Sequence, residues 1–133
     1  MKRSAWSFLL GAVLTACGGS SSSGGGGVPQ TVTLGMAFSP TLVSSIPGGS
    51  VIVQNSTGTN HTFTSEAAQG SFMPGGAGTP PVSFDTGAFQ GTMTVNIPAT
   101  ATVGTKVWAY CNIHKTAAEQ AEVQIVAGGG GGY

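Results

Sequence analysis

Two cysteines and two histidines are the side chains of this 133-residue chain best suited to bind a transition metal. Cys111 and His114 stand three residues apart, and His61 lies 50 residues before Cys111. One thiolate, two imidazoles and a weaker axial ligand form the trigonal copper sites of electron-transfer proteins. Each residue alone also has an ordinary alternative, because His61 could cap a turn, His114 could lie in a solvated loop and Cys111 could be buried in the core.

The elements that must position these residues are short β-strands. Apolar residues alternate in runs such as Met93-Val95-Ile97 and Val123-Ile125, and glycines and prolines interrupt them at short intervals. We expect strands at residues 30–38, 41–45, 50–55, 61–65, 82–85, 91–97, 106–111 and 122–126. Seven or eight short strands in one all-β domain predict a Greek-key β-sandwich or barrel. Residues 67–81 are rich in glycine and proline, and we expect them to be the most mobile loop.

Residues 51–126 resemble the plastocyanin-like branch of the cupredoxin family of type 1 copper proteins. The resemblance rests on Asn60-His61-Thr62-Phe63, on the turn Phe84-Asp85-Thr86-Gly87 and on the loop Tyr110-Cys111-Asn112-Ile113-His114. It implies a β-sandwich with one copper ion at one end, held by His61, Cys111 and His114.

The chain departs from this branch at the axial ligand. The branch usually has methionine five residues after the loop histidine, and here that position is Glu119. A carboxylate favours Cu(II), so we expect Glu119 to be the axial ligand, with Gln120 or Met73 as alternatives. Cysteine, two histidines and glutamate would also suit a tetrahedral zinc site, which leaves a structural zinc-binding lipoprotein as an alternative.

Composition excludes several classes of function. Only 6% of the residues are charged, and four basic residues against four acidic ones give no surface that could neutralise nucleic acid. No phosphate-binding or dinucleotide-binding motif occurs. Both histidines are needed for one metal site, so no second copper centre can form and we do not expect an enzyme. We expect a monomer that carries single electrons to an unidentified redox partner protein, with copper delivery or storage, or a structural lipoprotein without metal, as the alternatives.

The N-terminus predicts export and membrane attachment. Residues 1–16 have two basic residues followed by an apolar run, which is typical of a signal peptide, and Leu14-Thr15-Ala16-Cys17 resembles the bacterial lipobox. We therefore expect a lipid on Cys17, a Gly/Ser linker over residues 17–27, a copper-binding domain over 28–127 and a disordered tail over 128–133. Gly18 in place of aspartate favours the outer membrane, with the domain facing the periplasm.

Changing Cys17 to Ser should remove the lipid and leave the protein soluble or unprocessed. Fractionation of cells that express the parent and the variant, with detection of lipid on the parent, measures this. Membrane association that survives the substitution would instead mean that the apolar run of residues 6–14 remains as the anchor.

Overall fold

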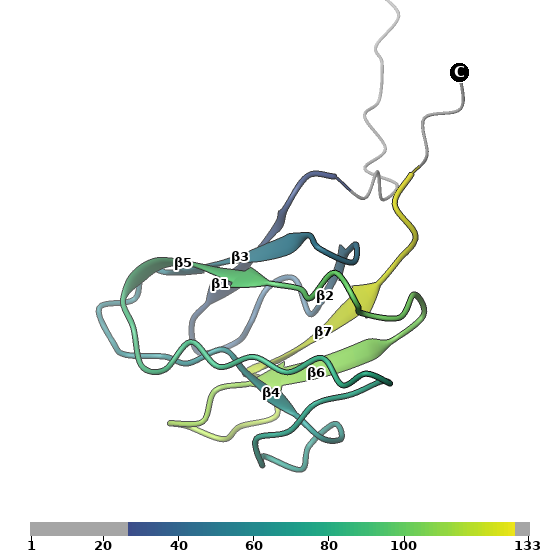
Figure 1. Ribbon diagram of the computed structural model, residues 1–133. Coiled ribbons are helices and arrows are strands. Elements are labelled where there is room, and N and C mark those ends of the chain that lie inside the picture. Colours follow the sequence, from purple (N-terminus) through teal and green to yellow (C-terminus); the bar gives the residue numbers. More distant parts are fainter. Residues whose placement is uncertain (1–26, 130–133) are drawn as a thin grey trace, which may run out of the picture.

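The computed structural model describes residues 27–129, which form two stacked β-sheets (Figure 1). The seven strands are β1 (Gln30–Leu34), β2 (Leu42–Ser45), β3 (Ser50–Asn55), β4 (Thr64–Glu66), β5 (Gly91–Asn96), β6 (Lys106–Tyr110) and β7 (Gln120–Ile125). No helix occurs within residues 27–129, so none there is long and apolar enough to cross a membrane. The predicted all-β sandwich of seven or eight strands is confirmed. The signal peptide, Cys17 and the end of the tail lie outside the described residues.

One sheet has the order β1-β3-β5 and the other the order β2-β7-β6-β4. The β1–β3 and β2–β7 pairs are parallel, and the β3–β5, β6–β7 and β4–β6 pairs are antiparallel. In β3, Val51, Val53 and Asn55 are buried while Gln54 is exposed, as expected when alternate side chains of a strand face the opposite sheet. This alternation places the apolar residues of both sheets in one core.

Aromatic rings fill the core below the predicted metal site. Phe63 is fully buried, and its ring stacks on the Phe84 ring at a centroid distance of 5.4 Å. The Phe38 ring is tilted against the Phe63 ring at a centroid distance of 5.9 Å. Trp108 is only half-buried, because it lies on the outer face of its sheet. Phe63 therefore belongs to the core, whereas Trp108 packs only in part.

The strand expected at residues 82–85 does not form. Val82 and Asp85 make only isolated bridges, to Ala77 and Thr64 respectively. A proline at position 81 removes a backbone donor, and this limits a continuous ladder. The first strand also ends at Leu34 rather than at residue 38, and β4 begins at Thr64 rather than at residue 61.

The glycine-rich segment 67–81 covers the outer face of the four-stranded sheet. Its Phe72 ring meets the buried Tyr110 ring edge-on at a centroid distance of 5.9 Å. Its backbone also donates from Gly75 to the Ser65 carbonyl at 3.0 Å. These contacts attach to the sheet a loop that we expected to be loosely held.

The ends of the described chain leave the sandwich together. Residues 27–29 and Val126 line one small hollow, at the end where β7 finishes (Figure 1). The loop between β6 and β7 lies at the opposite end of the same strands. Since each strand residue advances the chain by about 3.3 Å, the six residues of β7 separate the two ends by about 20 Å.

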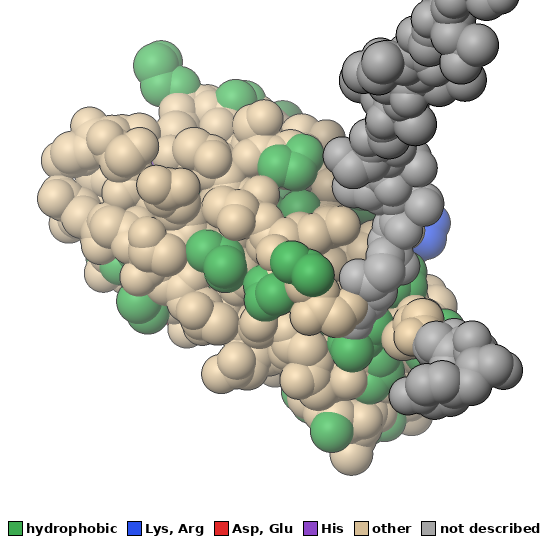
Figure 2. Space-filling view, turned by 90° about the horizontal axis from the view of Figure 1, so that it is seen from above, with side chains coloured by type: hydrophobic (Ala, Val, Ile, Leu, Met, Phe, Trp, Pro, Cys, Tyr) green, Lys and Arg blue, Asp and Glu red, His purple; other side chains and the backbone are tan. Residues whose placement is uncertain are grey.

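The surface is largely uncharged. Figure 2 shows hydrophobic side chains scattered among other polar side chains and backbone, with a basic side chain only at one edge of this face and no acidic side chain in view. In the described part of the chain, Lys106 and Glu122 are the lysine and acid that approach each other, at 3.9 Å. The fold therefore depends on burial and backbone hydrogen bonds rather than on surface ion pairs.

Candidate metal centre

The β6–β7 ladder determines where two of the predicted ligands lie. Tyr110, the last residue of β6, pairs with Gln120, the first residue of β7. Cys111 directly follows this pair and Glu119 directly precedes it, and the Cys111 backbone N–H donates to the Glu119 carbonyl at 3.2 Å. Both side chains continue the inward alternation of their strands, so a thiol and a carboxyl group lie at the same end of the core.

His114 enters the site from the loop that joins these two strands. The Lys115 N–H donates to the Cys111 carbonyl at 2.9 Å, which closes one tight turn, and Glu119 N–H closes a second on the Thr116 carbonyl at 3.1 Å. Lys115 has a φ of 54°, in the left-handed region that non-glycine residues rarely adopt. The two turns fold the loop back so that His114 lies over Cys111.

His61 enters from the other side of the sandwich. It forms an isolated antiparallel bridge with Phe89, with Phe89 N–H donating to the His61 carbonyl at 3.0 Å. The buried Asn55 side chain reinforces this bridge, because its amide donates to the carbonyls of Phe89 at 2.7 Å and Thr59 at 2.8 Å. Asn55 thereby holds the segment that leads into His61.

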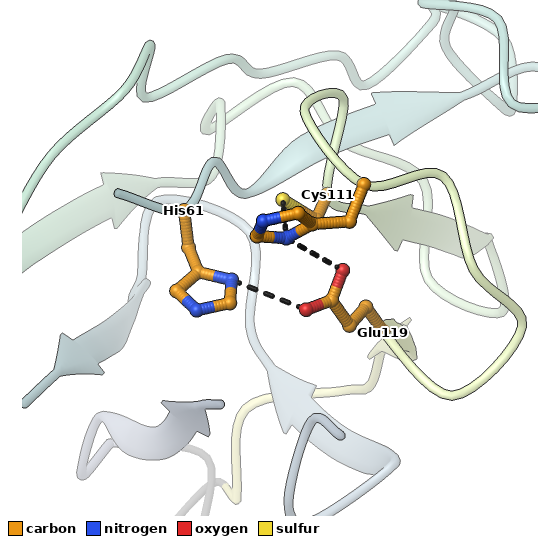
Figure 3. A group of neighbouring side chains, drawn as sticks. His61, Cys111 and Glu119 are labelled. Atoms are coloured by element: carbon orange, nitrogen blue, oxygen red, sulfur yellow. Dashed lines mark hydrogen bonds and ion pairs between the residues drawn. The ribbon is translucent and has the colours of Figure 1, made fainter. Parts of the chain in front are cut away.

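The four side chains His61, Cys111, His114 and Glu119 form one cluster, with a possible ligand atom of each within 4.8 Å of the others (Figure 3). The two carboxylate oxygens of Glu119 face the two imidazoles, at 3.3 Å from Nδ1 of His61 and 3.0 Å from Nδ1 of His114. Cys111 Sγ is 3.4 Å from the same nitrogen of His114. The structure thus brings together the residues singled out in the sequence.

Two possible ligand atoms of this cluster, His61 Nδ1 and Glu119 Oε2, make no well-aligned hydrogen bond with any described residue, although each lies within 3.3 Å of another group of the cluster. The side chains of His61 and Glu119 are each 4% exposed. A buried polar atom without a partner costs about 1–3 kcal/mol. A cation between these groups would satisfy both atoms, so the residues present fit a bound metal ion.

Electrostatics keep His61 in the form that binds metals. Burial lowers the pKa of His61 below the ordinary value of 6.5, an effect that nearby Glu119 opposes and nearby His114 adds to. Only the neutral imidazole has a free nitrogen lone pair for a metal. The environment of His61 therefore favours its ligand form at neutral pH.

Thr62 holds the thiolate position. Its backbone N–H points to Cys111 Sγ at 3.5 Å, and its hydroxyl accepts a hydrogen bond from the Asn112 N–H at 2.7 Å. These contacts join the His61 segment to the Cys111 loop across 50 positions of sequence. Sequence reasoning missed Thr62 and Asn55 as supports. The available signals were that Thr62 follows a predicted ligand and that Asn55 ends a predicted strand.

No family model matches the sequence, and no curated protein matches it significantly. Among solved structures, the fold is similar to that of the Cu-containing nitrite reductase NirK from Thermus scotoductus, at 18% identity and a TM-score of 0.50. That match covers 74% of this chain and 22% of the reductase chain, so the chain spans about a fifth of the reductase. The chain has a cupredoxin-like fold.

Smaller proteins give further matches to the cupredoxin-like domain. Reduced auracyanin from Roseiflexus castenholzii is 11% identical with a TM-score of 0.47, over 76% of this chain and 99% of that one. Auracyanin A from Chloroflexus aurantiacus, described as a "blue" copper protein, is 13% identical with a TM-score of 0.46, over 75% and 99%. Identities this low concern the fold alone. The likeness to the reductase domain, at a TM-score of 0.50, confirms the resemblance seen in the sequence at the level of the fold.

The two alternative axial residues lie away from the cluster of this cupredoxin-like domain. Gln120 turns to the outer face of the sheet, where its amide donates to Glu66 at 2.6 Å. Met73 is 66% exposed in the loop that covers that face. Of the three candidates for the axial position, Glu119 is thus the one that the structure places beside the two histidines.

The cluster is exposed to solvent mainly at His114. His114 has 33% of its side chain exposed, whereas Cys111 is fully buried. A hollow of about 320 Å³ lies over this opening, lined by Met36, Thr57, Thr59, His61, His114, Thr116 and Glu119. Apart from the cluster itself, the lining carries no charged side chain. The His114 ring is the part of the site that a partner can approach.

Proposed function

We propose that this domain binds one copper ion through His61, Cys111, His114 and Glu119 and carries single electrons in the bacterial cell envelope. The observation that supports this most strongly is the cluster of four possible ligands, in which His61 Nδ1 and Glu119 Oε2 are buried and lie within 3.3 Å of another ligand group without making a well-aligned hydrogen bond. Bound copper would supply one-electron chemistry by alternating between Cu(II) and Cu(I).

The donor set favours copper over zinc. A thiolate and two imidazoles suit both oxidation states of copper, and copper exceeds zinc in intrinsic affinity for such ligands. The Glu119 carboxylate adds a hard anionic oxygen that favours Cu(II). A closed four-ligand zinc site remains the alternative, and it would be structural and colourless.

The surroundings favour an electron carrier over a delivery protein. A carrier needs ligands that stay in place when the charge of the site changes, whereas a delivery protein must release its ion. Here Cys111, His61 and Glu119 are buried, and backbone hydrogen bonds fix the residues around them. Hydrogen bonds from Thr62 and Asn55 add support from outside the ligand set.

We also propose that the domain acts without catalysis. The 133 residues contain two histidines, and both belong to the one cluster. A second copper centre of the kind that copper oxidases and nitrite reductases use would need further histidines. The match to the reductase covers 22% of that chain, and it shows a similarity of fold alone.

Electrons would leave through the exposed edge of His114. Ile113 beside it is 48% exposed, and Met36 at the rim of the hollow is 94% exposed. Lys115 is the charged side chain next in sequence. A partner would therefore dock by apolar contact, and long-range electrostatic steering would contribute little. The lipid on Cys17 and the linker that follows would keep this domain at the outer membrane, facing the periplasm.

Copper-loaded protein should show an intense thiolate-to-copper absorption band and a Cu(II) EPR signal, and Cys111→Ser should abolish the band. Serine offers an alcohol that does not replace a thiolate ligand. A band retained in Cys111→Ser would disprove the assignment of Cys111, and a colourless parent that holds zinc in the presence of copper would favour the structural site.

Glu119→Met should raise the reduction potential, because it removes a negative charge that stabilises Cu(II). A tenfold loss of preference for Cu(II) corresponds to about 59 mV for one electron, and we expect a rise of at least this size in a voltammetric titration. Glu122→Gln, which removes a charge outside the cluster, is the control and should leave the potential near the parent's value. No change in Glu119→Met would place the carboxylate outside the ligand set.

Ile113→Lys should slow electron transfer to a redox partner protein about tenfold, which corresponds to about 1.4 kcal/mol of lost docking energy. Val103→Lys is the matched control, since Val103 is 51% exposed at the far end of the sandwich, and it should have little effect. The parent rate should vary only weakly with ionic strength. A steep salt dependence, or equal rates in both variants, would mean that electrons leave by another face.

A further inference from the structure

A second buried carboxylate lies outside the metal cluster, on the outer face of the four-stranded sheet. Glu66 ends β4 with 1% of its surface exposed, and it makes no ion pair with any described residue. Its oxygens accept hydrogen bonds from Gly70 N at 3.1 Å, Phe72 N at 2.8 Å, Ser71 Oγ at 3.3 Å and Gln120 Nε2 at 2.6 Å. A buried carboxylate needs such donors, since they replace its lost hydration.

The bond from Gln120 is the one that links Glu66 to the metal cluster. It joins residues 54 positions apart, and at 2.6 Å it is a short, charge-assisted hydrogen bond. Gln120 is 7% exposed and follows Glu119 directly in the chain. Because successive strand residues face opposite sides, an anchor on Gln120 outside the sheet fixes the backbone from which the Glu119 carboxylate points inward.

Glu119 depends on its backbone for this position. Its carboxylate oxygens lie 3.3 Å from Nδ1 of His61 and 3.0 Å from Nδ1 of His114, but Oε2 makes no well-aligned hydrogen bond with any described residue. The backbone has two constraints, the bond from Glu119 N to the Thr116 carbonyl and the bond from Cys111 N to the Glu119 carbonyl. The first lies on the loop side and the second continues the β6–β7 ladder, and the side chain of Gln120 adds a constraint from the outer face of the sheet.

We propose that Glu66 and Gln120 are positioning residues that hold the Glu119 carboxylate toward the metal, an inference that rests on the proposed function of the cluster. Glu66 also binds the backbone of residues 70 and 72, so the same carboxylate ties the covering loop to the start of β7. The ligand position and the packing of that loop are therefore coupled through one buried group.

The test compares Gln120→Leu with Gln124→Leu in the full chain. Gln124 is a matched control, because it lies on the same strand and face and makes a bond of the same length, 2.6 Å, to Glu122. Gln120→Asn, whose shorter side chain cannot span the same distance, serves as a second variant if leucine prevents folding. The readouts are Cu(II) affinity by competition with a chelator, the EPR spectrum of the copper-loaded protein, and the imidazole ¹⁵N shifts of His61 and His114 without metal.

Loss of an outer-shell partner typically weakens metal affinity about 10- to 100-fold, and we expect a loss in this range with an altered EPR spectrum for the Gln120 variants. The imidazole shifts should move in the same variants, and all three readouts should stay at parent values in Gln124→Leu. Parent-like readouts in the Gln120 variants, or equal changes in the control, would overturn the proposal. If the parent binds no copper, the proposed function fails, and the imidazole shifts still decide whether Gln120 positions Glu119.

Discussion

The antiparallel pairing of Tyr110 with Gln120 is the constraint on which the rest of the site depends. It places Cys111 and Glu119 on either side of one ladder step, with the Cys111 N–H bonded to the Glu119 carbonyl. The loop between them must then return within a few residues, and its two turns carry His114 over the thiol. A chain that lost this pairing would lose three of the four donors together, while His61 arrives independently from the bridge to Phe89.

Burying the ligand atoms of the cluster costs folding free energy, and the surrounding hydrogen bonds hold the segments that carry these atoms in place. Each polar atom buried without a hydrogen bond costs about 1–3 kcal/mol, which is substantial beside the roughly 5–15 kcal/mol that stabilises a typical domain. His61 Nδ1 and Glu119 Oε2 make no well-aligned hydrogen bond and have only the ion-pair contacts within the cluster. Thr62 links the His61 segment to Cys111, and Asn55 bonds to the Phe89 carbonyl beside the bridge of His61, so the backbone on both sides of the cluster is held in place. The fold thereby holds buried ligand atoms in positions where a bound cation would satisfy them.

Much of this arrangement could be read from the sequence. The alternation of Val123 and Ile125 predicts an inward face, and extending it by two residues at a time reaches Glu119 and excludes Gln120, which the structure places outside. The spacing of Cys111 and His114 likewise gave two donors on one loop. The hydrogen bonds from Gln120 to Glu66 and from Asn55 to Phe89 span 54 and 34 positions, and local patterns carry no information on such pairs. The strand expected at residues 82–85 does not form for a different reason. Its residues make only isolated bridges, Val82 to Ala77 and Asp85 to Thr64 of β4, and these do not extend into a continuous ladder.

The described chain leaves the domain at the end opposite the loop that carries His114, and this would affect how the domain is oriented on a membrane. Residues 27–29 leave the sandwich at the end where β7 finishes, about 20 Å along the strands from the loop that carries His114. An N-terminal attachment would therefore hold the domain at the end farthest from the exposed edge of the His114 imidazole. Because the surface around that edge is apolar or uncharged except for Lys115, an anionic membrane would neither hold it nor orient it strongly. The exposed edge of His114 would then face away from the attachment point, where a partner protein can reach it.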